Sequence, residues 1–547
     1  MKDWWKTAVF YELYVRSFSD SNGDGVGDFP GITSKLDYLS DLGIDCIWLT
    51  PFYPSPNVDY GYDIFDYYDV DPSFGSLQDF EQFLSAAHVR GIKVIADLVL
   101  NHTSNQHPWF VESASSRSNP KRDWYIWRDE PNNWQSGFEG TSWTYDEQTG
   151  QYYYHAFSKE QVDLNWWNPD VRRELFKVVE FWLDKGIDGF RLDVINHFFV
   201  DNQFRDNPVV DGKQNHVYDK DRPETHDIVK ELRQFVDRYP DKVLVGEVAT
   251  EQVEIAKSYV GNAQELDLAF NFNLGSLPDF DPDRLFEELT KLEQSLEQTA
   301  LPTLFFSSHD MSRQVTRFFA RCDDDVKVAL AKTLAAITLT AKGVPFLYYG
   351  EEIGMQDVYL PKADQIRDVG GLSAYERAVS EGKSLAEAIQ IGNQKGRDKG
   401  RSPMQWSDTE YAGFSSSASW LPVNNNYKRL NVLAEEQDPT SVLSFYRNLI
   451  ALRKKHSALS SGEYRVLNKS GDVIYFHKVT QDEQVVVFLN FGDSPRNVDW
   501  NKWFGYAYTS VRLLLSNHRT SYTWDGPLTL HPYEALISVV SPQEETK

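Results

Sequence analysis

Cysteine is scarce in this sequence, which has only two among 547 residues. Two cysteines cannot form the disulfide framework of many secreted proteins, and Cys46 and Cys322 are predicted to be free thiols. The first strand-like run begins near residue 9, which leaves no room for a secretory signal with a charged start and an apolar stretch. We therefore expect a reducing compartment and a cytoplasmic protein.

Basic residues are fewer than acidic ones, and every long apolar run is interrupted. The chain has 55 Lys and Arg against 81 Asp and Glu, a net charge of −26, which opposes binding to nucleic acid or acidic membranes. The most apolar long stretch, residues 328–349, contains two lysines and a Gly-Val-Pro break, so it does not predict a membrane span. Small neutral ligands fit this charge balance best.

Short runs of β-branched and aromatic residues alternate with helical patterns along most of the chain. Each run ends in polar residues and precedes apolar residues spaced three and four apart, which is typical of parallel βα units. Eight such runs predict an α/β fold built on a (βα)8 TIM barrel. The predicted strands are residues 9–15, 46–49, 93–98, 189–193, 243–247, 266–270, 302–306 and 345–347.

Two parts of the chain depart from this alternation. The stretch between the third and fourth runs is rich in Trp, Tyr, Asn and Gly and contains a predicted hairpin element at 151–157. Near the end of the chain the helical pattern stops, and alternating apolar runs predict an all-β module. We expect a catalytic barrel of residues 1–101 and 168–460, an inserted domain of residues 102–167, and a C-terminal β-sandwich domain of residues 461–547.

Acidic side chains stand where several predicted strands end. Enzymes built on this barrel carry their catalytic groups at the carboxyl ends of the strands. Asp193 ends the fourth strand, Glu247 ends the fifth, and Asp310 follows the seventh. Any one of them could instead cap the next helix, but their matched positions favour one shared site.

These acids suit glycoside hydrolysis. One carboxyl group protonates the leaving oxygen, and a second, about 5–5.5 Å away in retaining enzymes, attacks the anomeric carbon. Arg191 lies two residues before Asp193 on a strand, so it faces the same side and can keep that carboxylate ionised. Crowding among the acids favours a proton on one of them, which we assign to Glu247.

Four segments in this order resemble the ordered motifs of the α-amylase superfamily of glycoside hydrolases. The resemblance covers nearly the whole chain and implies Asp193 as nucleophile and Glu247 as general acid/base. It implies Asp310 as the residue that grips the hydroxyls of the sugar ring and stabilises the transition state. The segments are residues 97–102, 189–193, 246–248 and 309–310, with residues 161–165 similar to the family's additional motif.

Within that superfamily, residues 59–63 and 401–406 are most similar to oligo-1,6-glucosidases and related α-glucosidases. The resemblance implies a retaining, exo-acting enzyme on short neutral gluco-oligosaccharides, with Asp59 and Arg401 paired at the bottom of a blind pocket. Arg397 lies close by and is an alternative sugar ligand. By the same resemblance Tyr62 stacks under the terminal glucose, unless it is core packing, and the subsite is completed by His102, Arg191 and His309.

The residue after the nucleophile is Val194, and valine there resembles the α-1,6 type, although valine is ordinary in any strand. Departures from the family pattern beside Glu247, at Ser308 and before Arg401 leave the best substrate open. An α-glucosidase for α-1,4 links or sucrose, or a trehalose-6-phosphate hydrolase, is the alternative. A non-catalytic barrel of the transporter-subunit kind is disfavoured because the three acids are present.

A loop after the first strand is rich in oxygen side chains, which suit a hard cation such as Ca²⁺. It resembles the start of an EF-hand loop, but the twelfth position is Gly31, where that motif requires Glu. Relatives in the oligo-1,6-glucosidase group hold a structural Ca²⁺ here, and an Asx-rich turn without metal is the alternative. The implied ligands are Asp20, Asn22, Asp24, Asp28 and the carbonyl of Val26.

Overall fold

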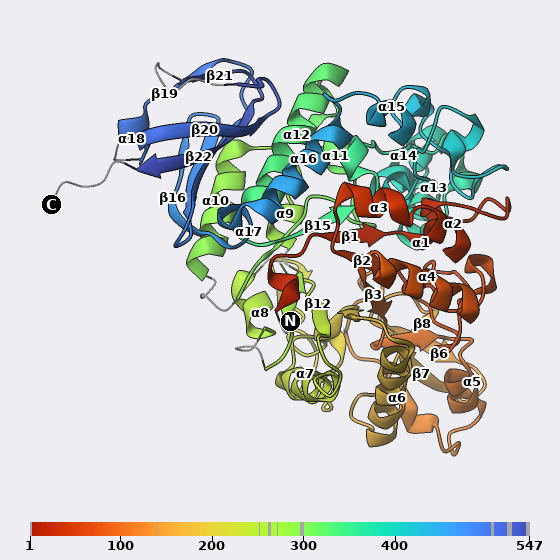
Figure 1. Ribbon diagram of the computed structural model, residues 1–547. Helices are drawn as coiled ribbons and strands as arrows, with labels where there is room; N and C mark the ends of the chain where they lie inside the picture. The colour runs from red at the N-terminus through yellow and green to blue at the C-terminus, as the bar shows by residue number, and fades with distance from the viewer. Residues whose placement is uncertain are drawn as a thin grey trace.

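The core of the protein is an eight-stranded sheet in which neighbouring strands run parallel, as its computed structural model shows (Figure 1). The structure describes residues 3–138, 140–250, 252–260, 264–270, 272–295, 300–504, 508–521 and 528–542. The strand order is β13-β12-β9-β3-β2-β1-β15-β14. The strands are β1 (Phe10–Leu13), β2 (Cys46–Leu49), β3 (Lys93–Leu98), β9 (Gly189–Leu192), β12 (Val243–Glu247), β13 (Leu268–Phe270), β14 (Thr303–Leu304) and β15 (Val344–Tyr348).

The sheet closes on itself where its two edge strands meet. The Thr303 hydroxyl of β14 donates a hydrogen bond to the Ala269 carbonyl of β13 at 3.4 Å. Inside the barrel, side chains from several strands pack together, and the Phe10 and Phe346 rings stack with centroids 4.5 Å apart. The predicted TIM barrel is confirmed, and each of the eight predicted runs overlaps one of its strands.

Helices cover the outside of the barrel, and local sequence signals explain their ends. Asn168 caps α6 through its side chain, Pro169 takes the first helical position, and Gly186 ends the helix in the left-handed region at φ 99°. The longer covering helices are α3 (Leu36–Leu42), α4 (Leu77–Val89), α6 (Pro169–Lys185), α7 (Pro223–Val236), α10 (Pro282–Ser295), α12 (Asp324–Thr340) and α16 (Val442–Lys455). Shorter ones are α1 (Val15–Phe18), α2 (Phe29–Ser34), α8 (Val253–Ser258), α9 (Phe272–Gly275), α11 (Gln314–Phe319), α15 (Val432–Glu436) and α17 (Ser457–Ser461).

The stretch between β3 and α6 folds over one side of the barrel (Figure 1). Its first and last strands pair antiparallel, so both of its ends lie together at the barrel rim. The predicted hairpin at 151–157 is present, because β7 pairs with both β5 and β6. The elements are β4 (His102–Ser104), α5 (Pro108–Ser115), β5 (Trp127–Arg128), β6 (Trp143–Asp146), β7 (Gln151–Tyr154) and β8 (Gln161–Asp163).

A second insertion follows β15 and forms a pair of packed helices, α13 (Val369–Ser380) and α14 (Leu385–Lys395). Asp368 caps α13 by accepting a hydrogen bond from the Gly371 amide. Between β9 and α7, a small ribbon is made by β10 (Val209–Val210) and β11 (Lys213–Gln214). In the described part of the chain, no helix is long and apolar enough to cross a membrane.

The C-terminal part is an antiparallel β module beside the barrel (Figure 1). The fully buried Lys478 of this module anchors it, since its ammonium group donates to the carbonyls of Thr340 and Leu459 at 3.0 and 2.9 Å. The five-stranded sheet contains β16 (Glu463–Ser470), β17 (Val473–Val479), β18 (Gln484–Asn490), β22 (Ala535–Pro542) and β20 (Tyr508–Ser516) in that order. A smaller sheet pairs β19 (Arg496–Val498) with β21 (Leu528–Leu530), and α18 spans Trp500–Phe504.

Candidate active site

The acids predicted to be catalytic meet at the carboxyl ends of the barrel strands. Asp193 directly follows β9, Glu247 is the last residue of β12, and Asp310 lies in the loop after β14. All of them line one cavity with an empty volume of about 620 Å³. The other lining residues are Asp59, Tyr62, His102, Phe138, Phe157, Gln161, Val194 and Arg397.

A buried arginine connects the acids on neighbouring strands. The Nη1 atom of Arg191 lies 2.8 Å from Asp193 Oδ1 and 2.8 Å from Asp97 Oδ1, and Nη2 forms an ion pair with Glu247. The Arg191 side chain is 3% exposed, so these charged hydrogen bonds are well shielded from water. One guanidinium thus brings the Asp193 and Glu247 carboxyl groups close together, in keeping with the narrow spacing of retaining glycosidases.

The electrostatic setting of Asp193 gives this pair a retained proton. Burial raises the pKa of Asp193 most strongly; the Arg191 guanidinium opposes this, and the Glu247 and Asp97 carboxylates add to the rise. Two carboxyl groups coupled in this way lose their protons in steps that belong to the pair. The pair is therefore suited to hold one proton in a range where an isolated aspartate has lost it.

Asp310 has the opposite electrostatic setting. Burial by itself would raise the pKa of this carboxyl, but His309, Arg397 and Arg401 hold the pKa well below its usual range. Its Oδ1 atom lies 3.1 Å from Arg397 Nη1 and 3.1 Å from Arg401 Nη2. One third of the Asp310 side chain is accessible, and this part faces the cavity it lines, so an ionised carboxylate is presented to a bound molecule.

The arginine that pairs with Asp59 differs from the expected one. Arg397 forms ion pairs with Asp59, Asp310 and Asp368, and its Nε lies 2.5 Å from Asp368 Oδ1. Arg401 is fully buried, and its Nε donates to the His309 carbonyl at 2.7 Å. The prediction that Asp59 pairs with Arg401 is therefore wrong, and the alternative residue Arg397 takes that position.

Tyr62 and His102 line the cavity, and His309 packs against Tyr62. The Tyr62 ring stacks on the His309 ring with centroids 5.4 Å apart, and its hydroxyl donates to Asp97 at 2.9 Å. His102 Nε2 lies 3.0 Å from the Tyr62 carbonyl. Burial lowers the pKa of His102 to about 4, so this imidazole is neutral at pH 7.

Val194 has a strained backbone. Its φ and ψ of 35° and 46° are left-handed, where a β-branched residue is an outlier at a cost of about 1–3 kcal/mol. This conformation turns its amide towards Glu247, and N–H donates to Oε2 at 3.3 Å. Val194 is 7% exposed and lines the cavity.

Several residues at the site were not predicted as ligands. Phe138 and Phe157, with ring centroids 5.8 Å apart, belong to the inserted domain, and Arg397 lies over Phe138 at 5.5 Å. Gln161 opens the motif at 161–165, and its amide donates to Asp59 at 3.2 Å. The motif was the only available signal for Gln161, and nothing in the sequence marks the two phenylalanines.

The oxygen-rich loop after β1 has a clear hydrogen-bonding pattern. Asp20 accepts from the amides of Asn22, Gly23 and Gly25, and Asp24 accepts from Val26. The chemistry of these donors fits a hard cation, but the carboxylates already serve the turns of the loop. Asp28 likewise caps α2 and binds Ser21. Across the described residues, no three Asp, Glu, His or Cys side chains are grouped so as to hold a metal ion, and calcium stays a prediction.

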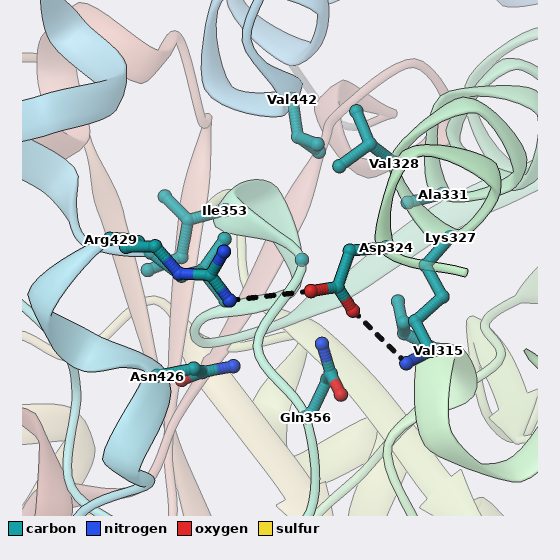
Figure 2. A pocket seen from close by; sticks show the side chains of 12 residues that line it. Val315, Asp324, Lys327, Val328, Ala331, Ile353, Gln356, Asn426, Arg429 and Val442 are labelled. Atoms are coloured by element: carbon teal, nitrogen blue, oxygen red, sulfur yellow. Dashed lines mark hydrogen bonds and ion pairs between the residues drawn. The ribbon is translucent and has the colours of Figure 1, made fainter. Parts of the chain in front are cut away.

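A second cavity, of about 580 Å³, lies between α11, α12 and the start of α16 (Figure 2). Val328, Ile353 and Val442 form an apolar wall. Asp324 is the only carboxylate among the described residues that line it, and Lys327 and Arg429 pair with it at 3.2 and 3.4 Å. Without a second acid, this cavity lacks the pair of carboxyl groups that glycoside hydrolysis requires.

Comparison with known proteins agrees with this geometry. The family model described as α-amylase, catalytic domain, matches residues 12–462. Oligo-1,6-glucosidase of Parageobacillus thermoglucosidasius is 42% identical over 557 residues, which cover 98% of each chain. The crystal structure of Bacillus licheniformis trehalose-6-phosphate hydrolase superposes with a TM-score of 0.89 at 36% identity, covering 98% of this chain and 100% of that one.

Trehalulose synthase from Pseudomonas mesoacidophila is similar to the same degree, with a TM-score of 0.89 at 36% identity over 98% of this chain and 99% of that one. The residues that match the family model run from within β1 to beyond β15 and contain Asp193, Glu247 and Asp310. The chain belongs to the α-amylase catalytic-domain family of glycoside hydrolases.

Proposed function

We propose that this protein is a retaining, exo-acting α-glucosidase that releases glucose from the non-reducing end of short α-glucosides and prefers isomaltose-type α-1,6 links. The observation that carries the proposal is the pair of carboxyl groups, Asp193 and Glu247, held together by Arg191 inside one cavity. The similarity to oligo-1,6-glucosidases along the whole chain supports the substrate class.

In this mechanism, Glu247 gives its proton to the glycosidic oxygen while Asp193 attacks the anomeric carbon from the opposite face. We assign the proton of the pair to Glu247 in the substrate complex, and the ion pair of Asp193 with Arg191 supports the ionised form that a nucleophile needs. Water, deprotonated by Glu247, then releases glucose with its α configuration restored. A sugar hydroxyl can replace that water, so transglycosylation accompanies hydrolysis.

The remaining residues would hold the terminal glucose. Asp310, ionised through its arginine neighbours, is suited to accept hydrogen bonds from ring hydroxyls that strengthen in the transition state. We infer that the Asp59–Arg397 ion pair forms the closed end of the pocket and contacts the sugar's far edge. A closed end admits one glucose unit, which is the basis for exo-action.

The α-1,6 preference predicts an order of substrates. Turnover of isomaltose should exceed that of maltose, because the rigid Val194 side chain at the cavity wall narrows the space for a sugar joined through a secondary hydroxyl. Initial rates on isomaltose, maltose, sucrose, kojibiose and nigerose at equal concentrations measure this. A clearly higher kcat/KM for maltose than for isomaltose would contradict the preference and leave the hydrolase assignment intact.

Trehalose-6-phosphate hydrolysis is the second candidate, favoured by the structural similarity to the Bacillus licheniformis enzyme. A phosphorylated sugar needs a free basic group near the second subsite. Arg397 is the only arginine or lysine among the residues described around the cavity, and it is engaged by Asp59, Asp310 and Asp368. Including trehalose-6-phosphate in the substrate panel separates the two functions.

We further propose a structural Ca²⁺ ion in the loop that contains Asp20, Asn22, Asp24, Asp28 and the Val26 carbonyl. The oxygen-rich donor set supports this. Incubation with EDTA should lower the melting temperature by several degrees, and elemental analysis of the purified protein should find about one calcium per chain. Unchanged melting together with the absence of calcium would favour a metal-free turn.

The proposed setting is a reducing compartment, the cytoplasm. Both cysteines are free thiols, with Cys46 buried inside the barrel, and this supports the proposal. Cell fractionation with a tagged full-length chain tests it directly, and recovery of the protein outside the cell would contradict it.

A further inference from the structure

Glu12 is a buried acid at the active site that lies beneath the cavity and not in its wall. It belongs to β1, its side chain is 2% exposed, and it faces His309 from the loop after β14. Glu12 Oε1 lies 3.0 Å from the backbone nitrogen of His309 and 2.6 Å from its ring nitrogen Nδ1. A single carboxylate oxygen therefore holds both the backbone and the ring of this histidine.

The other ring nitrogen of His309 faces two oxygen atoms. Nε2 lies 2.7 Å from the Tyr62 hydroxyl and 3.2 Å from Asp310 Oδ2. The Tyr62 hydroxyl also lies 2.9 Å from Asp97 Oδ2, so its one hydrogen can go to either neighbour. Asp310 is different, because its arginine neighbours keep its carboxylate ionised and it can only accept.

The His309 ring therefore lies between two carboxyl groups. Nδ1 faces Glu12 and Nε2 faces Asp310, and a neutral imidazole has only one N–H. A doubly protonated ring places an N–H towards both carboxyl groups. We propose that Glu12 is a positioning residue that holds His309 as an imidazolium cation beside Asp310.

Packing keeps the ring in this orientation. Tyr14 and Tyr62 stack on His309 with centroid distances of 6.2 and 5.4 Å, and Trp48 meets it edge-on at 5.9 Å. A flipped or rotated ring would lose the contact with Glu12. The ionisable groups that surround the Glu12–His309 pair are Tyr14, Tyr62, Asp97, Arg191, Asp310, Tyr348 and Arg401.

The proposed charge has a consequence for the reaction. An imidazolium beside Asp310 stabilises its carboxylate, which lines the cavity, more strongly than a neutral ring would. Glu12 balances that charge inside the barrel, because an unpaired buried cation would be costly. Glu12 acts through His309 and does not touch the sugar itself.

The test compares the wild-type enzyme with Glu12→Gln, which keeps the size of the side chain and removes its charge. Nitrogen-15 NMR of histidine-labelled protein at pH 7 should find both His309 nitrogens protonated in the wild type and one of them deprotonated in E12Q. The signals are assigned by their loss in His309→Asn. This measurement does not depend on the proposed α-glucosidase activity, on which the kinetic arm below rests.

In the kinetic arm, kcat/KM for p-nitrophenyl α-glucoside should fall about tenfold or more in E12Q at pH 7, the order of one charged hydrogen bond. The deficit should narrow as the pH is lowered, as expected if E12Q acts by removing a proton from the ring. In an H309N background, E12Q should cause no further loss. Glu352→Gln is the matched control, since Glu352 is a buried acid that binds Tyr11 and Tyr38 and does not face His309.

The E352Q variant should keep the pH profile of the wild type. A singly protonated His309 ring in the wild type would overturn the proposal, because the ring would then be neutral. An E12Q pH profile parallel to that of the wild type would also overturn it and leave Glu12 with a structural role alone. A wild-type enzyme without activity on any α-glucoside would refute the proposed function and not the charge state found by NMR.

Discussion

Replacing Asp193 with alanine is expected to lower kcat on p-nitrophenyl α-glucoside by about 10⁴-fold or more, because no glucosyl–enzyme bond can form. Glu247→Ala should behave differently. A general acid contributes about 10²–10⁴-fold, and this loss should be small for α-glucosyl fluoride, whose leaving group needs no proton. The contrast between the two substrates therefore separates the roles of the two acids.

Azide makes this test sharper. In E247A, azide can enter the vacated space and attack the glucosyl–Asp193 intermediate, which yields an α-glucosyl azide. In D193A, azide attacks the substrate directly from the opposite face, which yields the β-azide. Asp188→Asn is the matched control, because Asp188 precedes the same strand at its other end and pairs with Lys93. Exchanged product configurations would reverse the assigned roles.

Replacing Arg191 with glutamine should destabilise the protein by about 3–5 kcal/mol, because the carboxyl groups of Asp97, Asp193 and Glu247 lose a buried cation. The loss should depend on pH. Burial raises the pKa of Asp193 and of Asp97, and Arg191 opposes the rise in both. Without Arg191, these acids stay protonated to higher pH.

The sign of the pH dependence follows from this. An acid whose pKa is raised in the folded state favours folding at low pH, and this contribution is lost as pH increases through the raised pKa. The loss of unfolding free energy in R191Q relative to the wild type should therefore be small at pH 5 and large at pH 8, as measured by urea unfolding. The acid limb of its kcat/KM profile should also move to higher pH.

Arg233→Gln provides the control for Arg191. Arg233 is also buried and pairs with Asp267 and Asp237 at 2.6 and 2.8 Å, but it lies on α7, away from the cavity. R233Q should lose stability and keep the activity profile of the wild type. A deficit for R191Q that is equal at pH 5 and pH 8 would mean that the acids are not coupled through this guanidinium.

The barrel and its acids were predictable because they depend on local patterns. Strands of a parallel barrel are buried on both faces, so each one is a short continuous apolar run, such as β2 or β12. Asp193 and Glu247 stand where those runs end, and this is sufficient to place them on one rim. The two-residue spacing between Arg191 and Asp193 also predicted that both side chains face the same side of the strand.

Contacts between distant segments were not predictable in the same way. Arg397 and Arg401 are four residues apart on either side of a short 3-10 turn, and only the folded backbone determines which guanidinium reaches Asp59. Glu12 and His309 are 297 residues apart and meet because only β15 separates β1 from β14, the strand before His309, in the described sheet. Neither pairing has a signal in a single sequence.

The stereochemistry of the released sugar tests the central proposal most directly. Proton NMR can follow p-nitrophenyl α-D-glucoside during the first minutes of hydrolysis, before the anomers of glucose equilibrate in water. Double displacement through Asp193 predicts that α-glucose is formed first and β-glucose accumulates only by later mutarotation. Release of β-glucose as the first product would contradict the retaining mechanism and the role of Asp193 as its nucleophile.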